Sequence, residues 1–243
     1  MLVTGSSQVS EWYLGLGPLW LTLELASVTT LILLVLSTPI AYWLAYTPSR
    51  AKPLVEVLVA MPLVLPPTVL GFYLLILFRP NGFAGSLWYE LTGNSLLFSF
   101  AGLVIASVIY SLPFVVQPLQ NSFLAVGRNP MEKAATMGLN RFSRVFSVLI
   151  PQAKRGYVTA AVLGFTHTVG EFGVVLMVGG NIPRETRVVS IAIYDLVETS
   201  NFAKAHALSG LVAVLAFCLL LVVFTVGRAE QNKKKGVVHQ QLP

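Results

Sequence analysis

The chain has 243 residues, of which 55% are hydrophobic and only 11% charged, and its formal net charge is +6. Soluble domains carry about 25% charged residues, so this composition argues for a protein of the lipid bilayer. In such a protein an excess of positive charge indicates basic cytoplasmic loops rather than nucleic-acid binding. The single cysteine, Cys218, excludes an intrachain disulfide and a cysteine-based metal site, and we expect no metal site.

Five apolar runs are each long enough to cross about 30 Å of hydrocarbon. They predict an all-α, polytopic membrane protein that forms one domain over residues 1–243. We expect no sixth span and no cleavable signal peptide before residue 17, where glycines interrupt a short apolar run and no basic segment occurs. The predicted spans are Leu19–Ala45, Leu54–Phe78, Leu96–Val116, Val158–Val178 and Leu208–Val226.

The distribution of basic residues predicts how these spans are oriented. With the N-terminus outside, 12 lysines and arginines lie on the cytoplasmic side and 4 lie outside. Because basic loops stay in the cytoplasm, we predict an N-out, C-in arrangement. The loop at residues 129–151 would then be cytoplasmic, and residues 228–243 would form a basic cytoplasmic tail.

The second predicted span contains prolines that interrupt a regular helix. Pro62, Pro66 and Pro67 lack backbone donors, so they kink or break it. At membrane depth such a break is tolerated where protein or a water-filled cavity satisfies the freed carbonyl groups. Two interpretations remain open, a static kink packed against neighbouring helices and a bend that lines a transport pathway.

The fourth predicted span carries small and polar residues at helical spacing. Ala160, Gly164 and Thr168 recur every four residues and predict a face that allows close helix contact. His167 and Glu171 are also four residues apart, so we expect them to share a helix face and to interact. Glu171 has two interpretations, a functional intramembrane carboxylate and a structural group bonded to His167 or to helix-end backbone.

The loop at residues 129–151 begins with signals for a short helix over residues 130–137. Asn129 is a suitable N-cap, Pro130 suits the first helical position, and Glu132 suits a capping-box position. Gly138 is a natural residue just after the helix, where a left-handed conformation is common.

A second, amphipathic helix follows, with Asn140 as its predicted N-cap. Its apolar residues recur at positions i, i+3, i+4 and i+7, and Pro151 ends or bends it. An interfacial helix on the membrane surface would account for this part of the loop but not for the small residues of the first helix. The predicted apolar face consists of Phe142, Val145, Phe146 and Leu149.

This loop resembles the EAA loop of the membrane subunits of bacterial ABC importers. The matching pattern is Glu132-Lys-Ala-Ala-x-x-Gly138, then nine residues, then Val148-x-Ile-Pro151, with Lys133 in place of the family's first alanine. The resemblance implies a coupling helix that docks on a cytoplasmic ATPase subunit. The implied coupling residues are Glu132, Lys133, Ala134, Ala135, Gly138, Arg141 and Pro151.

Two further stretches, residues 61–75 and 170–190, resemble the molybdate permeases within that family. The run Asn181-Ile-Pro-x-Glu-Thr-Arg187 favours this branch, although Arg184 stands where the family often has glycine. The resemblance implies import of molybdate, and of tungstate, which has nearly the same shape. The alternative is a permease for sulfate, thiosulfate or another oxyanion.

The resemblance also implies an assembly in the bacterial inner membrane. We expect a homodimer with two ATPase subunits and an external molybdate-binding protein, and no nucleic-acid partner. The chain has no Gly-x-x-x-x-Gly-Lys-Ser/Thr loop, so we expect it to be no enzyme and to bind no cofactor, while the ATPase uses ATP and Mg²⁺.

Two groups of residues are candidates for contact with the transported anion. The first should line the pathway or gate: Pro66, Pro67, Thr166, Thr168, Gly170, Glu171 and Gly173. The second lies on the predicted external loop: Asn181, Arg184 and Arg187. The two arginines either meet the binding protein or attract the oxyanion, or they are ordinary loop charges paired with Glu185.

Overall fold

The computed structural model describes residues 16–239, and every regular element in this range is a helix. The expectations for the chain before residue 16 and for residues 240–243 lie outside the described residues. The helices are α2 (Leu16–Tyr46), α3 (Lys52–Val64), α4 (Pro67–Phe78), α5 (Phe83–Thr92), α6 (Phe100–Val126), α7 (Asn129–Thr136), α8 (Arg141–Arg144), η1 (Val145–Leu149), α9 (Ile150–Gln152), α10 (Lys154–Gly170), α11 (Gly173–Gly179), α12 (Val189–Glu198) and α13 (Phe202–His239).

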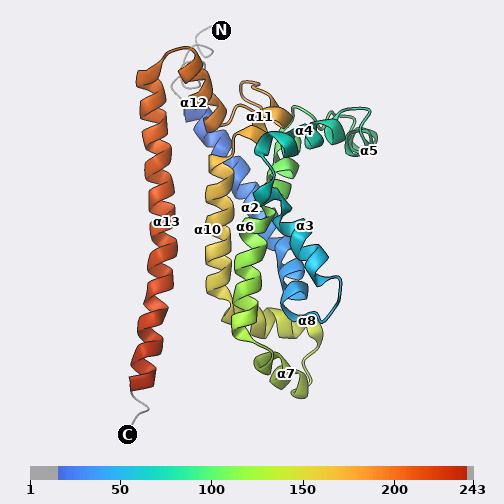
Figure 1. The fold of residues 1–243 in the computed structure, drawn as a ribbon, viewed down its shortest axis with the longest axis vertical. Coiled ribbons are helices and arrows are strands. Elements are labelled where there is room, and N and C mark those ends of the chain that lie inside the picture. The colour runs from blue at the N-terminus through green and yellow to red at the C-terminus, as the bar shows by residue number, and fades with distance from the viewer. Residues whose placement is uncertain (1–15, 240–243) are drawn as a thin grey trace, which may run out of the picture.

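Three described helices, α2, α6 and α13, are long and apolar enough to cross a membrane by themselves. Two bent pairs, α3 with α4 and α10 with α11, each pass the same test when taken together. Counting each pair as one span makes five among the described residues, which agrees with the predicted number. Figure 1 shows α2 and α13 both running from the top of the picture toward the bottom, where the short helices α7 and α8 lie.

The centre of the bundle is formed by α2, α6 and α10, which pack on one another. Leu33, Val115 and Ala160 are fully buried there. A Cβ at Gly164 would lie 2.6 Å from Val115 Cγ2, so the two helices approach closely only because this residue is glycine. This confirms the small-residue face of the fourth span; in lipid such close packing, rather than hydrophobic burial, holds helices together.

The remaining helices surround this centre unevenly. The α13 helix packs against α10 and α12, and only 11% of its most apolar window is buried. Its backbone stays helical to His239, so the predicted basic tail continues the helix for most of its length.

Two regions differ from the predicted boundaries. The third span does not end at Val116, because α6 continues to Val126 with Pro113 and Pro118 inside it. The polar Gln120 in this extension donates to Glu56 Oε1 of α3 over 3.0 Å. The helices α5 and α12 lie in segments that the sequence analysis treated as connections.

Candidate functional site

Both irregular spans are broken, the second at the prolines that the sequence singled out and the fourth where the sequence predicted a continuous helix face. The α3 and α4 helices meet at an angle of 109°, with Leu65 and Pro66 between them and Pro67 at the first position of α4. This confirms the predicted proline break, although Pro62 lies inside α3. The α10 and α11 helices meet at 63°, with Glu171 and Phe172 between them.

The second half of each broken span packs against the other, and glycines permit the approach. A Cβ at Gly71 would lie 2.9 Å from Met177 Cβ, and a Cβ at Gly173 would lie 2.9 Å from Pro67 Cβ. Ordinary contacts between carbon atoms are about 3.5–4.0 Å. The α4 and α11 helices therefore sit together as a tightly packed pair next to both breaks.

A cavity of about 560 Å³ lies beside the breaks. Its lining residues come from α4, α6, α10 and α11 and from the break in the fourth span: Pro67, Thr68, Tyr110, Thr166, His167, Gly170, Glu171, Phe172, Gly173, Leu176 and Met177. Five of the seven predicted pathway residues are among them. The lining contains no lysine or arginine, so a bound anion would meet hydroxyl groups and backbone rather than a fixed positive charge.

The other two pathway candidates do not line this cavity. Pro66 is the residue before α4, and Thr168 is buried against α6. Thr168 Oγ1 donates to the carbonyl of Gly164 over 3.0 Å and lies 3.1 Å from Ser111 Oγ. Its hydroxyl thus ties α10 to α6, which gives it a packing role in this conformation.

His167 is held by α6 rather than by Glu171. Its Nδ1 lies 2.8 Å from Ser111 Oγ, and its ring stacks on Phe114 with centroids 3.8 Å apart. Ser111 was missed by the sequence analysis, and it is one of several hydroxyl residues in the third span, so nothing in the sequence set it apart. These contacts fix the imidazole on the wall of the cavity.

The prediction that His167 and Glu171 share a helix face is wrong. The α10 helix ends at Gly170, and Glu171 has an extended backbone conformation with φ −69° and ψ 131°. The predicted bonds of its side chain to helix-end backbone are also absent, because neither carboxyl oxygen completes a hydrogen bond among the described residues. The Ser107 hydroxyl lies nearby, and the Glu171 backbone carbonyl accepts from Ser190 Oγ over 2.6 Å.

The loop at residues 129–151, which we call the coupling segment after its predicted role, forms the two helices that its sequence predicts, with one correction. The N-cap of α7 is Arg128 without a side-chain bond, so Asn129 and Glu132 do not form the expected cap and capping box. The end of the helix is as predicted. Gly138 has φ +83°, its N–H donates to Ala135, and the N–H of Leu139 donates to Ala134. This pair of bonds is the Schellman motif.

The first coupling helix presents a defined face to solvent. Glu132, Lys133 and Ala135 are exposed, whereas Ala134 is buried at 5% exposure, and α7 packs on α8 and η1. The sequence analysis missed Met137, whose apolar side chain is 78% exposed at the end of this face. Methionine is enriched at protein–protein interfaces relative to the rest of the surface.

The second coupling helix begins as predicted, where Asn140 Oδ1 accepts from the N–H of Ser143 over 2.8 Å. It then widens into a π-helical turn, η1, and continues through Pro151 to Gln152. The N–H of Ile150 donates to Val145, five residues back. Of the predicted apolar face, Leu149 is fully buried, but Phe142 and Phe146 are 79% and 65% exposed.

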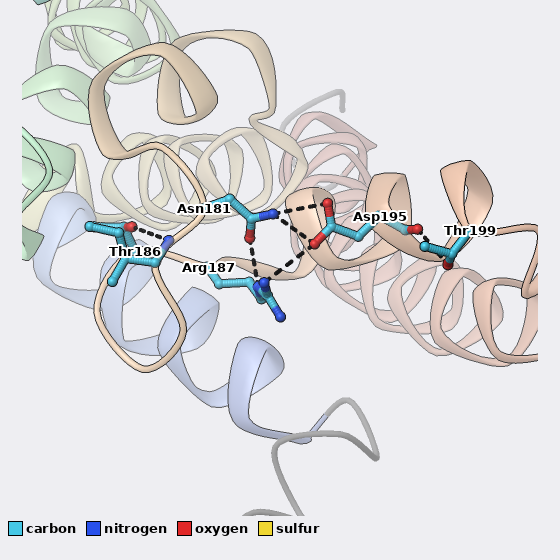
Figure 2. A network of polar contacts seen from close by, with 6 residues as sticks. Asn181, Thr186, Arg187, Asp195 and Thr199 are labelled. Atoms are coloured by element: carbon cyan, nitrogen blue, oxygen red, sulfur yellow. Dashed lines mark hydrogen bonds and ion pairs between the residues drawn. The ribbon is translucent and has the colours of Figure 1, made fainter.

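The candidate loop residues Asn181 and Arg187 belong to an internal polar network, shown in Figure 2. Asn181 Nδ2 donates to Asp195 Oδ2 over 2.7 Å, and Arg187 Nε donates to Asn181 Oδ1 over 2.6 Å. Arg187 also lies 3.6 Å from Asp195 Oδ2. Asp195 belongs to α12, which the sequence analysis did not predict, and it pairs with Arg187 within the protein.

Arg184 has a left-handed backbone conformation, with φ +72°. Glycine adopts this conformation without steric cost, whereas a residue with a Cβ pays about 1–2 kcal/mol. Arginine at this position therefore carries a steric cost that glycine would avoid.

Comparison with known proteins shows which family has this arrangement of broken spans and a helical loop. Residues 37–231 match the family model described as "Binding-protein-dependent transport system inner membrane component". The chain belongs to this family. It is therefore a transport subunit, with several spans in the inner membrane.

Individual relatives agree with the family model. The chain is 54% identical over 213 residues to the molybdenum transport system permease protein ModB of Azotobacter vinelandii, covering 88% of this chain and 94% of that protein. It is 29% identical over 187 residues to the sulfate transport system permease protein CysT of Escherichia coli, covering 77% and 66%. In fold it is similar to a chain of the MetNI methionine ABC transporter in an inward-facing conformation, with a TM-score of 0.68, 19% identity and coverage of 89% and 96%.

Proposed function

We propose that this family member is the membrane-spanning permease of an importer that carries molybdate, and tungstate with it. The observation that carries the proposal is the 54% identity, over nearly the whole chain, to a molybdenum transport permease. The sulfate permease among the relatives makes sulfate the alternative to be tested.

The proposed assembly is a homodimer in the inner membrane with two ATPase subunits and an external molybdate-binding protein. The ATPases, not this chain, use ATP and Mg²⁺. The excess of cytoplasmic basic residues supports an N-out, C-in orientation, with α7 and α8 facing the ATPases. Closure of the ATPase pair on ATP moves the coupling segment, and the spans alternate between inward-facing and outward-facing conformations.

The proposed docking face on α7 consists of its exposed residues Glu132, Lys133 and Ala135, extended by Met137. Ala134 contributes by letting α7 pack on α8 and η1, so that a push on α7 reaches the helix that leads into α10. A cysteine replacing Ala135, with Cys218 replaced by serine, should cross-link to a cysteine-bearing ATPase subunit. Absence of the cross-link in every nucleotide state would exclude this contact.

The proposed anion route passes the cavity beside the two breaks. Thr166 lines this cavity, and its hydroxyl has no hydrogen-bond partner among the described residues. A free hydroxyl donates well to an oxyanion, and the absence of a fixed cation avoids a tight site that would slow release. An ionised Glu171 repels the same dianion, so we place the route along the Thr166 wall.

The decisive measurement is uptake of labelled molybdate by a strain that lacks its own permease and carries this chain with its ATPase and binding protein. Uptake should fall when unlabelled tungstate is added and should be unaffected by sulfate at the same concentration. Competition by equimolar sulfate would identify a sulfate-type permease instead.

A further inference from the structure

A second cavity, apolar and about 830 Å³ in volume, lies between α2 and the second coupling helix. Its walls include Leu34, Val35 and Pro39 of α2 and Phe142 and Phe146 of the coupling segment. Its size falls within the range of about 300–1,000 Å³ that is typical of small-molecule sites. The proposed anion route does not use this groove, and we refer to it as the α2 groove.

The α2 groove carries two arginines at its edge. Arg141 and Arg144 line it, and no acidic side chain forms an ion pair with either of them among residues 16–239. The Nε of Arg144 is buried and has no hydrogen-bond partner there. By contrast, the two hydroxyls of the groove, on Thr38 and Tyr157, lie 2.9 Å apart and satisfy one another. The arginines of the groove therefore lack an anionic hydrogen-bond acceptor within the part of the chain that the structure describes.

The position of the groove relative to the bilayer points to the source of that anion. Leu34 and Tyr42 lie 12 and 4 residues before the end of α2, which corresponds to depths of about 18 and 6 Å along the helix. The coupling segment runs across the ends of α2 and α6 rather than along them (Figure 1). The groove thus extends from the end of the bundle, where headgroups lie, into the depth of acyl chains.

We propose that the α2 groove binds an anionic phospholipid of the inner leaflet. An acyl chain lies along Leu34, Val35 and Phe146, and the phosphate accepts hydrogen bonds from Arg141 and Arg144. Basic pockets beside spans on the cytoplasmic side suit such headgroups. No residue of α7 lines the groove, so the proposed lipid site and the docking face on α7 are formed by different residues.

The test uses the full chain purified with its ATPase subunits in detergent. Native mass spectrometry counts the phospholipids retained after addition of dioleoyl phosphatidylglycerol or of dioleoyl phosphatidylcholine. Wild type should retain phosphatidylglycerol selectively. Retention should weaken about fivefold for each arginine removed in Arg144→Gln and in the double variant with Arg141→Gln. The matched control is Arg50→Gln, an exposed arginine in the connection after α2, which should retain lipid as wild type does.

A photoreactive benzoylphenylalanine in place of Phe146 identifies the occupant directly. It should label phosphatidylglycerol in vesicles that contain the assembled transporter. Labelling of the ATPase or of a second permease copy would overturn the proposal, as would equal lipid retention by the double variant and Arg50→Gln. Both readouts are independent of which anion is transported.

Discussion

The contact between the two broken spans makes a specific prediction for Gly173→Ala. The added methyl would lie 2.9 Å from Pro67 Cβ, at least about 0.6 Å inside an ordinary carbon contact. Pro67 is rigid and is the first residue of α4, so α4 and α11 have to move apart beside the cavity. Overpacking of this kind costs about 1–3 kcal/mol. For a chain of this length we expect a fall in Tm of roughly 2–4 °C for each kcal/mol.

Gly170→Ala is the matched control, because it adds the same methyl at the same break and a Cβ there has no neighbour within 4 Å. The assays are thermal unfolding of the purified complex and molybdate uptake in cells. Gly173→Ala should lower both Tm and uptake, whereas Gly170→Ala should leave Tm unchanged or slightly raised. Equal Tm values for the two variants would refute the inference that α4 and α11 depend on this close contact.

Substitutions at three other positions test the remaining parts of the structure. Thr166→Ala should raise the KM for molybdate about tenfold, because a donor to the anion is lost, while Thr166→Ser should keep the wild-type value; equal KM values for the two would exclude the hydroxyl. Gly138→Ala should destabilise the coupling loop by about 1–2 kcal/mol and weaken binding of the ATPase in a pull-down titration, and Gly138→Asn should do so less, because asparagine tolerates positive φ better. Asp195→Asn should lower Tm by roughly 2–4 °C, since it removes the charge that orients Arg187 and costs about 1 kcal/mol at a partly exposed site; an unchanged Tm would contradict the role assigned to the network.

Features with a local cause could be predicted from the sequence. Three such features act within a few residues: a glycine after a short helix, an asparagine before the next one, and two adjacent prolines. The structure has the corresponding turn at Gly138, cap at Asn140 and break at Pro66. The N-cap at Asn129 failed because Arg128 already has helical dihedral angles, so the helix starts one residue early.

Features that depend on distant neighbours could not be predicted in this way. The role of Arg187 depends on Asp195, which the sequence places in an unremarkable stretch and which only α12 brings close. The partner of His167 is Ser111, 56 residues away, rather than the acid four residues along the chain. The size of the bend at Pro66 is likewise set by packing of α4 on α11, since proline determines where a helix breaks and neighbours determine the angle.

In the proposed assembly, the π-helical turn at Val145–Leu149 affects how a motion of the coupling segment reaches α10. One extra residue per turn rotates everything before it by about 100° relative to a continuous α-helix. The rotation of α8 about the helix axis relative to α9 therefore depends on the number of residues in η1 and not on which side chains they carry. Deleting one residue from η1 would leave α7 and α10 helical. A motion of α7 would then be passed to α10 in a different direction.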